Sequence, residues 1–253
     1  GLMDLNEYAY FSLIILAANS ILVLSDPLAK FVIPRLTYIY TSDIKNFKEY
    51  YNNLSQIGCV IIGSISITLV SFSEEILYIW TSDEGLVNWS GSVFNFFVIG
   101  NAILTVSAFQ YYLQCAIGNL DLHVKGTTLS ALLQVPAIYF IAKYFGVHGV
   151  AIFWMLFRIF WFIIWSPFVH VKFLKDYHLK WFFLGIIPII LIPIFFAYIL
   201  CYFIKIDVSN TFESLFLILF FFLIILLLSI ISSNFLRKKF SFYIYSKLFK
   251  CYQ

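Results

Sequence analysis

The sequence predicts an all-α, polytopic bundle of membrane-spanning helices. Hydrophobic residues make up 62% and charged residues 11% of the 253-residue chain, a composition outside the range of ordinary soluble domains. The apolar residues gather in seven long runs, and about 20 such residues suffice to cross the roughly 30 Å hydrocarbon core as a helix. The predicted crossings are Tyr8–Ile33, Leu54–Trp80, Gly91–Ile117, Thr127–Tyr144, Val150–Val171, Trp181–Ile204 and Glu213–Phe235.

Positive charge is distributed unevenly over the segments between these runs. When the segments are assigned alternately to two sides, twelve Lys and Arg residues fall on one side and only Lys143 and Lys205 on the other. Cytoplasmic segments are the ones enriched in Lys and Arg. We therefore expect the amino end outside and the carboxyl terminus in the cytoplasm. The twelve are Arg35, Lys45, Lys48, Lys125, Lys172, Lys175, Lys180, Arg237, Lys238, Lys239, Lys247 and Lys250.

The composition also argues against several classes of site. The net charge is +3 and its basic residues lie in short segments, where membrane lipid headgroups account for them and no nucleic-acid partner is expected. The four cysteines are far apart, and His123, His148, His170 and His178 lie at helix ends or in loops. We expect these histidines not to form a cluster. We therefore predict no metal, no cofactor and no catalytic residue.

The third crossing carries two polar faces. One face holds Ser107, Gln110 and Gln114, and the nearly opposite face holds Asn101, Thr105 and Tyr112. Unpaired amides in hydrocarbon are costly, so this helix is not expected to face lipid broadly. Each amide either bonds a neighbouring helix or lines a cavity, and the pattern leaves both interpretations open.

Arg158 lies near the middle of the fifth crossing, about ten residues, or roughly 15 Å, from either end. A central arginine costs about 2.5–3.5 kcal/mol on insertion scales. Trp154, Trp161 and Trp165, at i−4, i+3 and i+7, are spaced to offer ring faces to the guanidinium. Arg158 is either a phosphate-binding or gating cation in a wet cavity, or a structural residue bonded to carbonyls or paired with a carboxylate.

Asp26 and Lys30 are one helical turn apart in the first crossing, with Pro27 between them as a predicted kink. The i, i+4 spacing favours a local ion pair that lowers the cost of burial. The alternative is that Asp26 carries a proton or sodium ion in a transporter.

Four local patterns, in order along residues 5–181, resemble those of the oligosaccharide flippase family. These proteins are the O-antigen and capsule-repeat exporters of the multidrug/oligosaccharidyl-lipid/polysaccharide exporter superfamily. The family's usual glycine is replaced by Ala9, and Asp26 and Lys30 depart from a usually apolar pattern. The patterns are LNEYAY at 5–10, PRLT at 34–37 preceded by Pro27, YLQCAIG at 112–118 and GVHGVAIFW at 146–154.

The resemblance implies an exporter with two six-helix lobes around a cavity that opens alternately to each membrane face. Residues 1–175 would form five helices of the second lobe, and residues 176–253 two additional helices with a basic cytoplasmic tail. The partner would be a missing amino-terminal lobe, an expectation supported by the initial Gly and the odd number of crossings. The location would be the bacterial inner membrane.

The family's substrates are polyprenyl-diphosphate-linked oligosaccharides, and a deep arginine suits a diphosphate because guanidinium binds phosphate bidentately. The residues expected to bind or translocate substrate are Arg158, Gln114, Gln110, Asn101 and Lys30, with Asp26 as the ion-coupling candidate. Two alternatives remain. A glycan polymerase or acyltransferase would need acid/base groups converging at one interface, and a drug or cation exporter would need deep acidic residues. Export without enzymatic activity is the prediction.

Overall fold

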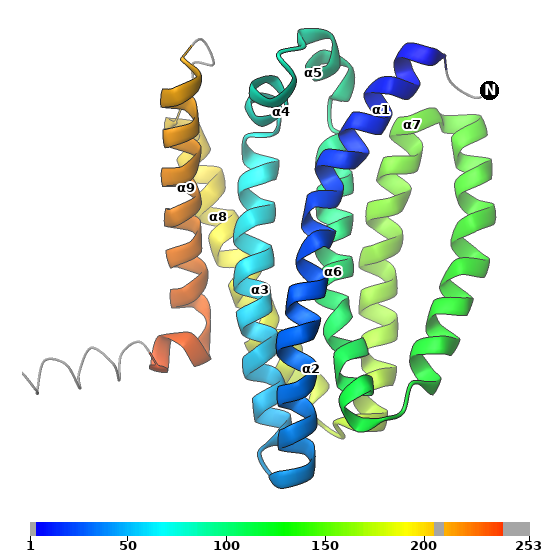
Figure 1. Cartoon of the computed structure of the whole chain (residues 1–253), viewed down its shortest axis with the longest axis vertical. Helices are drawn as coiled ribbons and strands as arrows, with labels where there is room; N and C mark the ends of the chain where they lie inside the picture. Colours follow the sequence, from blue (N-terminus) through cyan, green and yellow to red (C-terminus); the bar gives the residue numbers. More distant parts are fainter. Residues whose placement is uncertain (1–3, 205–209, 240–253) are drawn as a thin grey trace, which may run out of the picture.

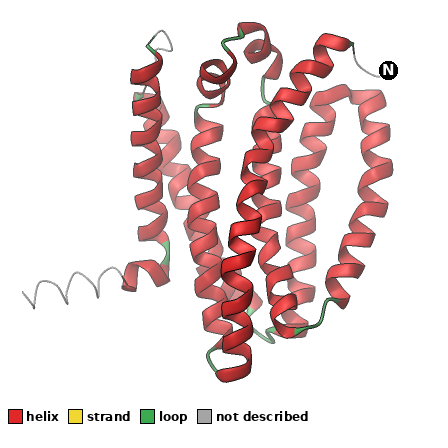
Figure 2. Ribbon diagram, in the orientation of Figure 1, coloured by secondary structure: helices red, strands yellow, loops and turns green. Residues whose placement is uncertain are grey.

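A computed structural model describes residues 4–204 and 210–239 of the chain. The predicted all-α membrane bundle is confirmed, because the described residues form helices and no strands (Figures 1 and 2). Six of these helices are long and apolar enough to cross a membrane. They run side by side along one axis, as a multi-pass membrane protein requires (Figure 1).

The first crossing consists of α1 (Leu5–Ala18), the 3₁₀ helix η1 (Asn19–Leu24) and α2 (Ser25–Ser42). A capping box starts α1, because the Asp4 side chain accepts from the Glu7 backbone N–H at 2.7 Å. The irregular part is η1, which ends before Pro27. The predicted kink between Asp26 and Lys30 is thus displaced toward the amino end.

The second and third crossings are α3 (Phe47–Ser71) and α6 (Val93–Ile117). The second begins earlier than predicted and breaks at Phe72, after which α4 (Ser73–Thr81) and α5 (Glu84–Ser90) fold over one end of the bundle (Figure 1). Helix α6 ends where Gly118 adopts a left-handed conformation, with φ of 77°, which is the common glycine stop signal.

The fourth and fifth predicted crossings form one element, α7 (Asp121–Phe173). Gly146, with φ 61° and ψ −158°, interrupts its helical geometry, and the chain reverses there (Figure 1). Only glycine adopts such a conformation readily. The first arm (residues 121–145) and the second arm (residues 147–173) are each about 37–40 Å long, enough to cross a bilayer.

The last two crossings are less buried than α3 and α6. They comprise the π-helix η2 (Lys180–Ile186) with α8 (Ile187–Phe203), and then α9 (Thr211–Ser232), followed by a helical turn at 234–239. Helices α8 and α9 pack on α3, and large apolar side chains such as Tyr198 and Phe212 remain exposed on them. This surface suits contact with lipid.

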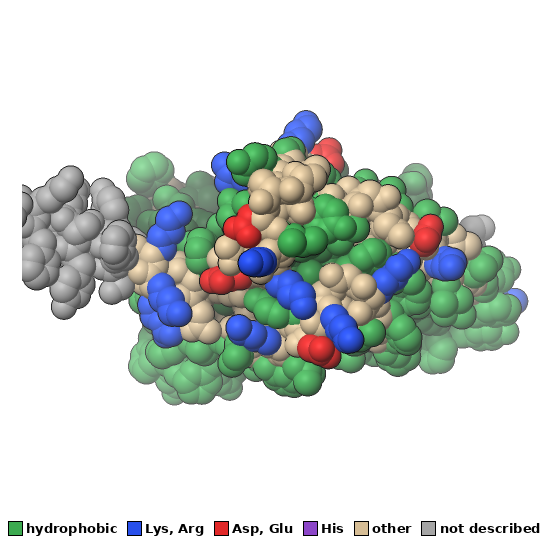
Figure 3. Space-filling model, turned by 90° about the horizontal axis from the view of Figure 1, so that it is seen from below, with side chains coloured by type: hydrophobic (Ala, Val, Ile, Leu, Met, Phe, Trp, Pro, Cys, Tyr) green, Lys and Arg blue, Asp and Glu red, His purple; other side chains and the backbone are tan. Residues whose placement is uncertain are grey.

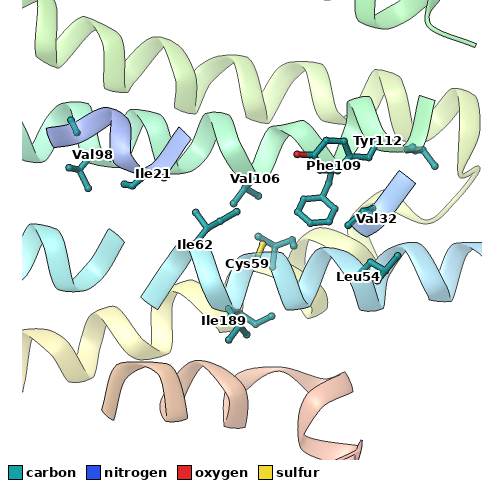
Figure 4. Close-up of a cluster of buried hydrophobic side chains, with 14 of the residues drawn as sticks. Ile21, Val32, Leu54, Cys59, Ile62, Val98, Val106, Phe109, Tyr112 and Ile189 are labelled. Atoms are coloured by element: carbon teal, nitrogen blue, oxygen red, sulfur yellow. The ribbon is translucent and has the colours of Figure 1, made fainter. Parts of the chain in front are cut away.

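The apolar core lies where α3, α6, α8 and the first crossing meet (Figure 4). Ile62 and Cys59 of α3 lie opposite Val106 and Phe109 of α6 in this view, and Ile189 of α8 covers the other side of α3. The core therefore holds together segments that are far apart in sequence and leaves the α7 arms at one side.

The two ends of the bundle differ in charge. We call the end formed by residues 43–46, 118–120 and 174–179 the basic end, and lysine and arginine side chains are spread over it (Figure 3). The opposite end, capped by α4 and α5, is called the acidic end because it carries Glu74, Glu75, Asp83 and Glu84. Lys205, Lys247 and Lys250 lie outside the described residues.

Candidate anion-binding cavity

A cavity of about 470 Å³ lies between α6, both arms of α7 and the junction of η1 with α2. Trp161, Phe162 and Trp165 form its aromatic side. Its polar side chains are Ser25, Ser107, Gln110, Tyr111, Gln114, His123, Thr127, Ser130 and Arg158. We call this space the Arg158 cavity.

Among the residues that the structure describes, Arg158 is the only Lys or Arg that lines this cavity. Its side chain is half-buried, and its Nε is buried without a hydrogen-bond partner. Within residues 4–204 and 210–239 the guanidinium forms no ion pair, since the one ion pair there joins Lys172 to Asp121 at 3.8 Å. An unpaired cation at membrane depth is costly, and an anion in the cavity would offset that cost.

The Trp154 ring supports the guanidinium, whose Cζ lies 4.3 Å from the ring centroid. Trp161 and Trp165, also expected beside the arginine, instead stack on each other at 5.3 Å and line the cavity. The second α7 arm packs closely against two glycines that leave room for its indole rings. A Cβ at Gly100 of α6 would overlap Trp154, and a Cβ at Gly126 of the first α7 arm would overlap Trp165.

The two polar faces of α6 serve different neighbours. Gln110 donates to the Ser166 hydroxyl, and Gln110 and Gln114 both line the cavity. Gln114 donates to the Gln110 carbonyl at 3.2 Å and accepts from the His123 backbone N–H at 2.8 Å. Gln114 therefore also stabilises the first turn of α7, whose N–H groups lack helical partners.

Asn101 lies on the other face and does not line the cavity. It is 0% exposed, donates to the Ala18 carbonyl and to Asn19 Oδ1, both at 3.0 Å, and accepts from Trp154 Nε1 at 3.1 Å. Tyr112, on the same face of α6 as Asn101, donates to the Ser25 carbonyl at 2.8 Å. Asn101 thus links helices, and the structure places it away from any ligand in the cavity.

Asp26 and Lys30 do not form the predicted ion pair. Both side chains are exposed on α2, neither lines the Arg158 cavity, and the two do not contact each other as an ion pair. The physical reason is that both point out of the bundle, and an exposed i, i+4 pair gains only about 0.2–0.5 kcal/mol. The prediction was therefore wrong about the pairing.

The expectation that the histidines stay apart was also wrong. Nδ1 of His170 lies 2.9 Å from Nδ1 of His178, and Nε2 of His170 lies 3.0 Å from the hydroxyl of buried Tyr51. The chain bends between the two histidines, where Asp176 has φ of 60°. No group of three or more metal-ligating side chains occurs in the part of the chain that the structure describes.

Sequence reasoning missed the contribution of the first α7 arm to the cavity. Thr127 and Ser130 line it at i, i+3 spacing, and Gly126 makes room for Trp165 beside them. That spacing was visible in the sequence, but its significance depended on knowing that the two arms fold back on each other.

Comparison with protein-family models, curated proteins and solved structures finds no match.

Proposed function

We propose that this chain belongs to an exporter that moves a polyprenyl-diphosphate-linked oligosaccharide across a bacterial inner membrane for cell-surface polysaccharide assembly. The observation that carries the proposal is Arg158, an unpaired cation in a cavity at membrane depth. An intramembrane charge of this kind marks a substrate or ion path by default.

The chemistry of the Arg158 cavity suits a phosphate attached to a polar and apolar group. A guanidinium binds phosphate oxygens through two parallel hydrogen bonds. Hydroxyl and amide groups of Ser107, Ser130 and Gln110 lie in the same space as the rings of Trp161 and Trp165. The volume of about 470 Å³ lies in the lower half of the range for small-molecule sites, roughly 300–1,000 Å³. It suits a headgroup with its first sugar better than a whole oligosaccharide.

The open face of the first crossing supports a two-lobe arrangement. Asp26 and Lys30 are exposed within a helix long enough to cross the membrane. Charged side chains rarely face lipid, and they usually meet protein or a water-filled cavity. An amino-terminal lobe that covers this face would provide such surroundings, as the four sequence patterns also suggest.

The test is export of lipid-linked oligosaccharide by the intact protein in proteoliposomes made with defined lipid-linked sugars. We expect Arg158→Ala to insert normally and lose export, and Arg158→Lys to retain part of it because lysine keeps the charge without the fork geometry. Arg237→Ala is the matched control, since the Arg237 side chain is exposed and its guanidinium donates to Asn234 Oδ1 at 2.8 Å, away from the Arg158 cavity. Normal export by inserted Arg158→Ala protein would refute the proposed function.

Orientation is tested separately by thiol labelling in a cysteine-free background. We expect an external, membrane-impermeant reagent to reach a cysteine placed at Asp83, at the acidic end. It should not reach cysteines placed at Lys45, Lys125 or Lys175, at the basic end. Labelling in the reverse pattern would place the basic end outside the cell. Asp207, which we also expect to face outward, lies outside the described residues.

A further inference from the structure

Two hydrogen-bonded side chains, half-buried Trp154 and buried Asn101, connect the Arg158 guanidinium to the start of η1 in the first crossing. Trp154 lies beneath the guanidinium at 4.3 Å, and its Nε1–H donates to Asn101 Oδ1 at 3.1 Å. The indole also fits against Gly100, where any side chain would overlap it. The ring that supports Arg158 is therefore held both by shape and by one directional bond.

The other end of Asn101 is attached to the irregular segment η1. Its Nδ2 donates to the Ala18 carbonyl and to Asn19 Oδ1, at the point where α1 gives way to the 3₁₀ helix. All of these groups are satisfied within the protein, and Asn101 is fully buried. It therefore has no free polar atom for a substrate, although its residue type first suggested one.

We propose that Asn101 and Trp154 are positioning residues, which hold the Arg158 guanidinium toward the cavity and connect it to the η1 bend. The inference rests on the proposed function to the extent that Arg158 binds the substrate phosphate. A cation–π contact contributes about 0.5–2 kcal/mol, but only if the ring stays in place. Fixing the indole through Asn101 reduces the rotamer freedom that Arg158 loses when it binds an anion.

The first measurement is binding of farnesyl diphosphate to the chain in lipid nanodiscs, with inorganic pyrophosphate and farnesol as separate probes. Trp154→Phe keeps a ring but removes the donor, and Asn101→Leu removes both ends of the connection. Tyr112→Phe is the matched control, because it deletes another bond from α6 to the first crossing without touching Trp154 or Arg158. We expect the first two variants to bind about 2- to 10-fold more weakly and the control to bind as wild type does. Farnesyl diphosphate binding without pyrophosphate binding identifies a lipid headgroup, whereas equal binding of both identifies a free phosphate site.

The second measurement needs no ligand. It is the ¹⁵N order parameter of the Arg158 Nε–H, assigned by its loss in Arg158→Lys; Arg35 and Arg237 are the only other arginines in the chain. We expect a value near 0.85 in the wild type and in Tyr112→Phe, and below about 0.6 in Asn101→Leu and Trp154→Phe. Unchanged order in both of those variants overturns the positioning role, whatever binds. Reduced order in a chain that binds no diphosphate would support positioning and refute the proposed function instead.

Discussion

His170 and Arg158 lie twelve residues apart on the second arm of α7, and they differ in how many of their polar atoms have partners. His170 is 0% exposed, and each of its ring nitrogens has a partner, Tyr51 on one side and His178 on the other. Arg158 is half-buried, has no carboxylate partner in the described chain, and leaves its Nε unbonded.

This difference separates a structural polar group from a group available to a ligand. Buried polar groups are nearly always paired, because an unpaired one loses its hydrogen bonds to water. His170 obeys this rule, and the Trp181 ring packs 4.5 Å from the His170 ring, although Trp181 Nε1 is itself buried without a partner. Arg158 breaks the rule beside a cavity. A polar group without a protein partner next to open space is the one expected to bind something else.

The largest expected effect is a loss of stability when the cluster formed by Tyr51, His170, His178 and Trp181 is disrupted; we call it the His170 cluster. His170→Ala removes a fully buried ring and leaves the Tyr51 hydroxyl unpaired, so we expect the free energy of unfolding to fall by about 3–5 kcal/mol. His148→Ala is the matched control because His148 is exposed, and it should change stability by less than about 0.5 kcal/mol. Thermal and denaturant unfolding in detergent measure both. An unaffected His170→Ala variant would show that the cluster is not structural.

The next effect has the opposite sign. Arg158→Leu removes an uncompensated charge from the membrane region, so we expect stability to rise, by up to about 2.5–3.5 kcal/mol, while diphosphate binding is lost. The same unfolding assay, run without ligand, measures it. A clear loss of stability would place Arg158 with His170, as a structural residue whose partners matter to the fold.

Gln114 lies between a structural group and a ligand-binding group, because it lines the cavity but its amide is already hydrogen-bonded within the protein. Gln114→Leu removes the acceptor for the His123 backbone N–H at the start of α7. We expect a loss of about 1 kcal/mol in unfolding free energy, as for other helix-capping side chains, and nearly unchanged diphosphate binding. A large loss of affinity with little loss of stability would move Gln114 to the ligand-binding class.

The smallest expected effect is a pH dependence of the unfolding free energy, caused by His178 in the His170 cluster. Burial lowers the pKa of His178 from its ordinary value of 6.5, so the folded chain binds this proton less readily than the unfolded chain. Stability from this group is complete above pH 6.5 and decreases as the pH falls below it. The decrease should be small because the ring is half-exposed and solvent screens the charge. In His178→Asn the unfolding midpoint should change less between pH 7.5 and pH 5.5 than in the wild type, and an identical change would remove His178 as the cause.

Much of the fold was predictable because membrane spans are a local property of the sequence. Hydropathy and length located the crossings, and the glycines at 118 and 146 mark where helices stop or reverse. The predicted boundaries of the helices were wrong where contacts with other segments, rather than the local sequence, determined them. Phe72 breaks the second crossing, and η1 rather than Pro27 holds the irregular turn of the first. The two polar faces of α6 were visible from spacing, but spacing could not assign one to the cavity and the other to the first crossing.

The sequence by itself determined that this is an all-α membrane bundle with asymmetric charge and one arginine deep in a span. Those features depend on the order of residues along single helices. Only the tertiary structure decided that Asp26 and Lys30 stay apart, that His170 meets His178, and that Asn101 holds Trp154 beneath Arg158. Whether a polar group is satisfied depends on which distant segment lies opposite it, and that is set by the packing of helices rather than by the periodicity of any one of them.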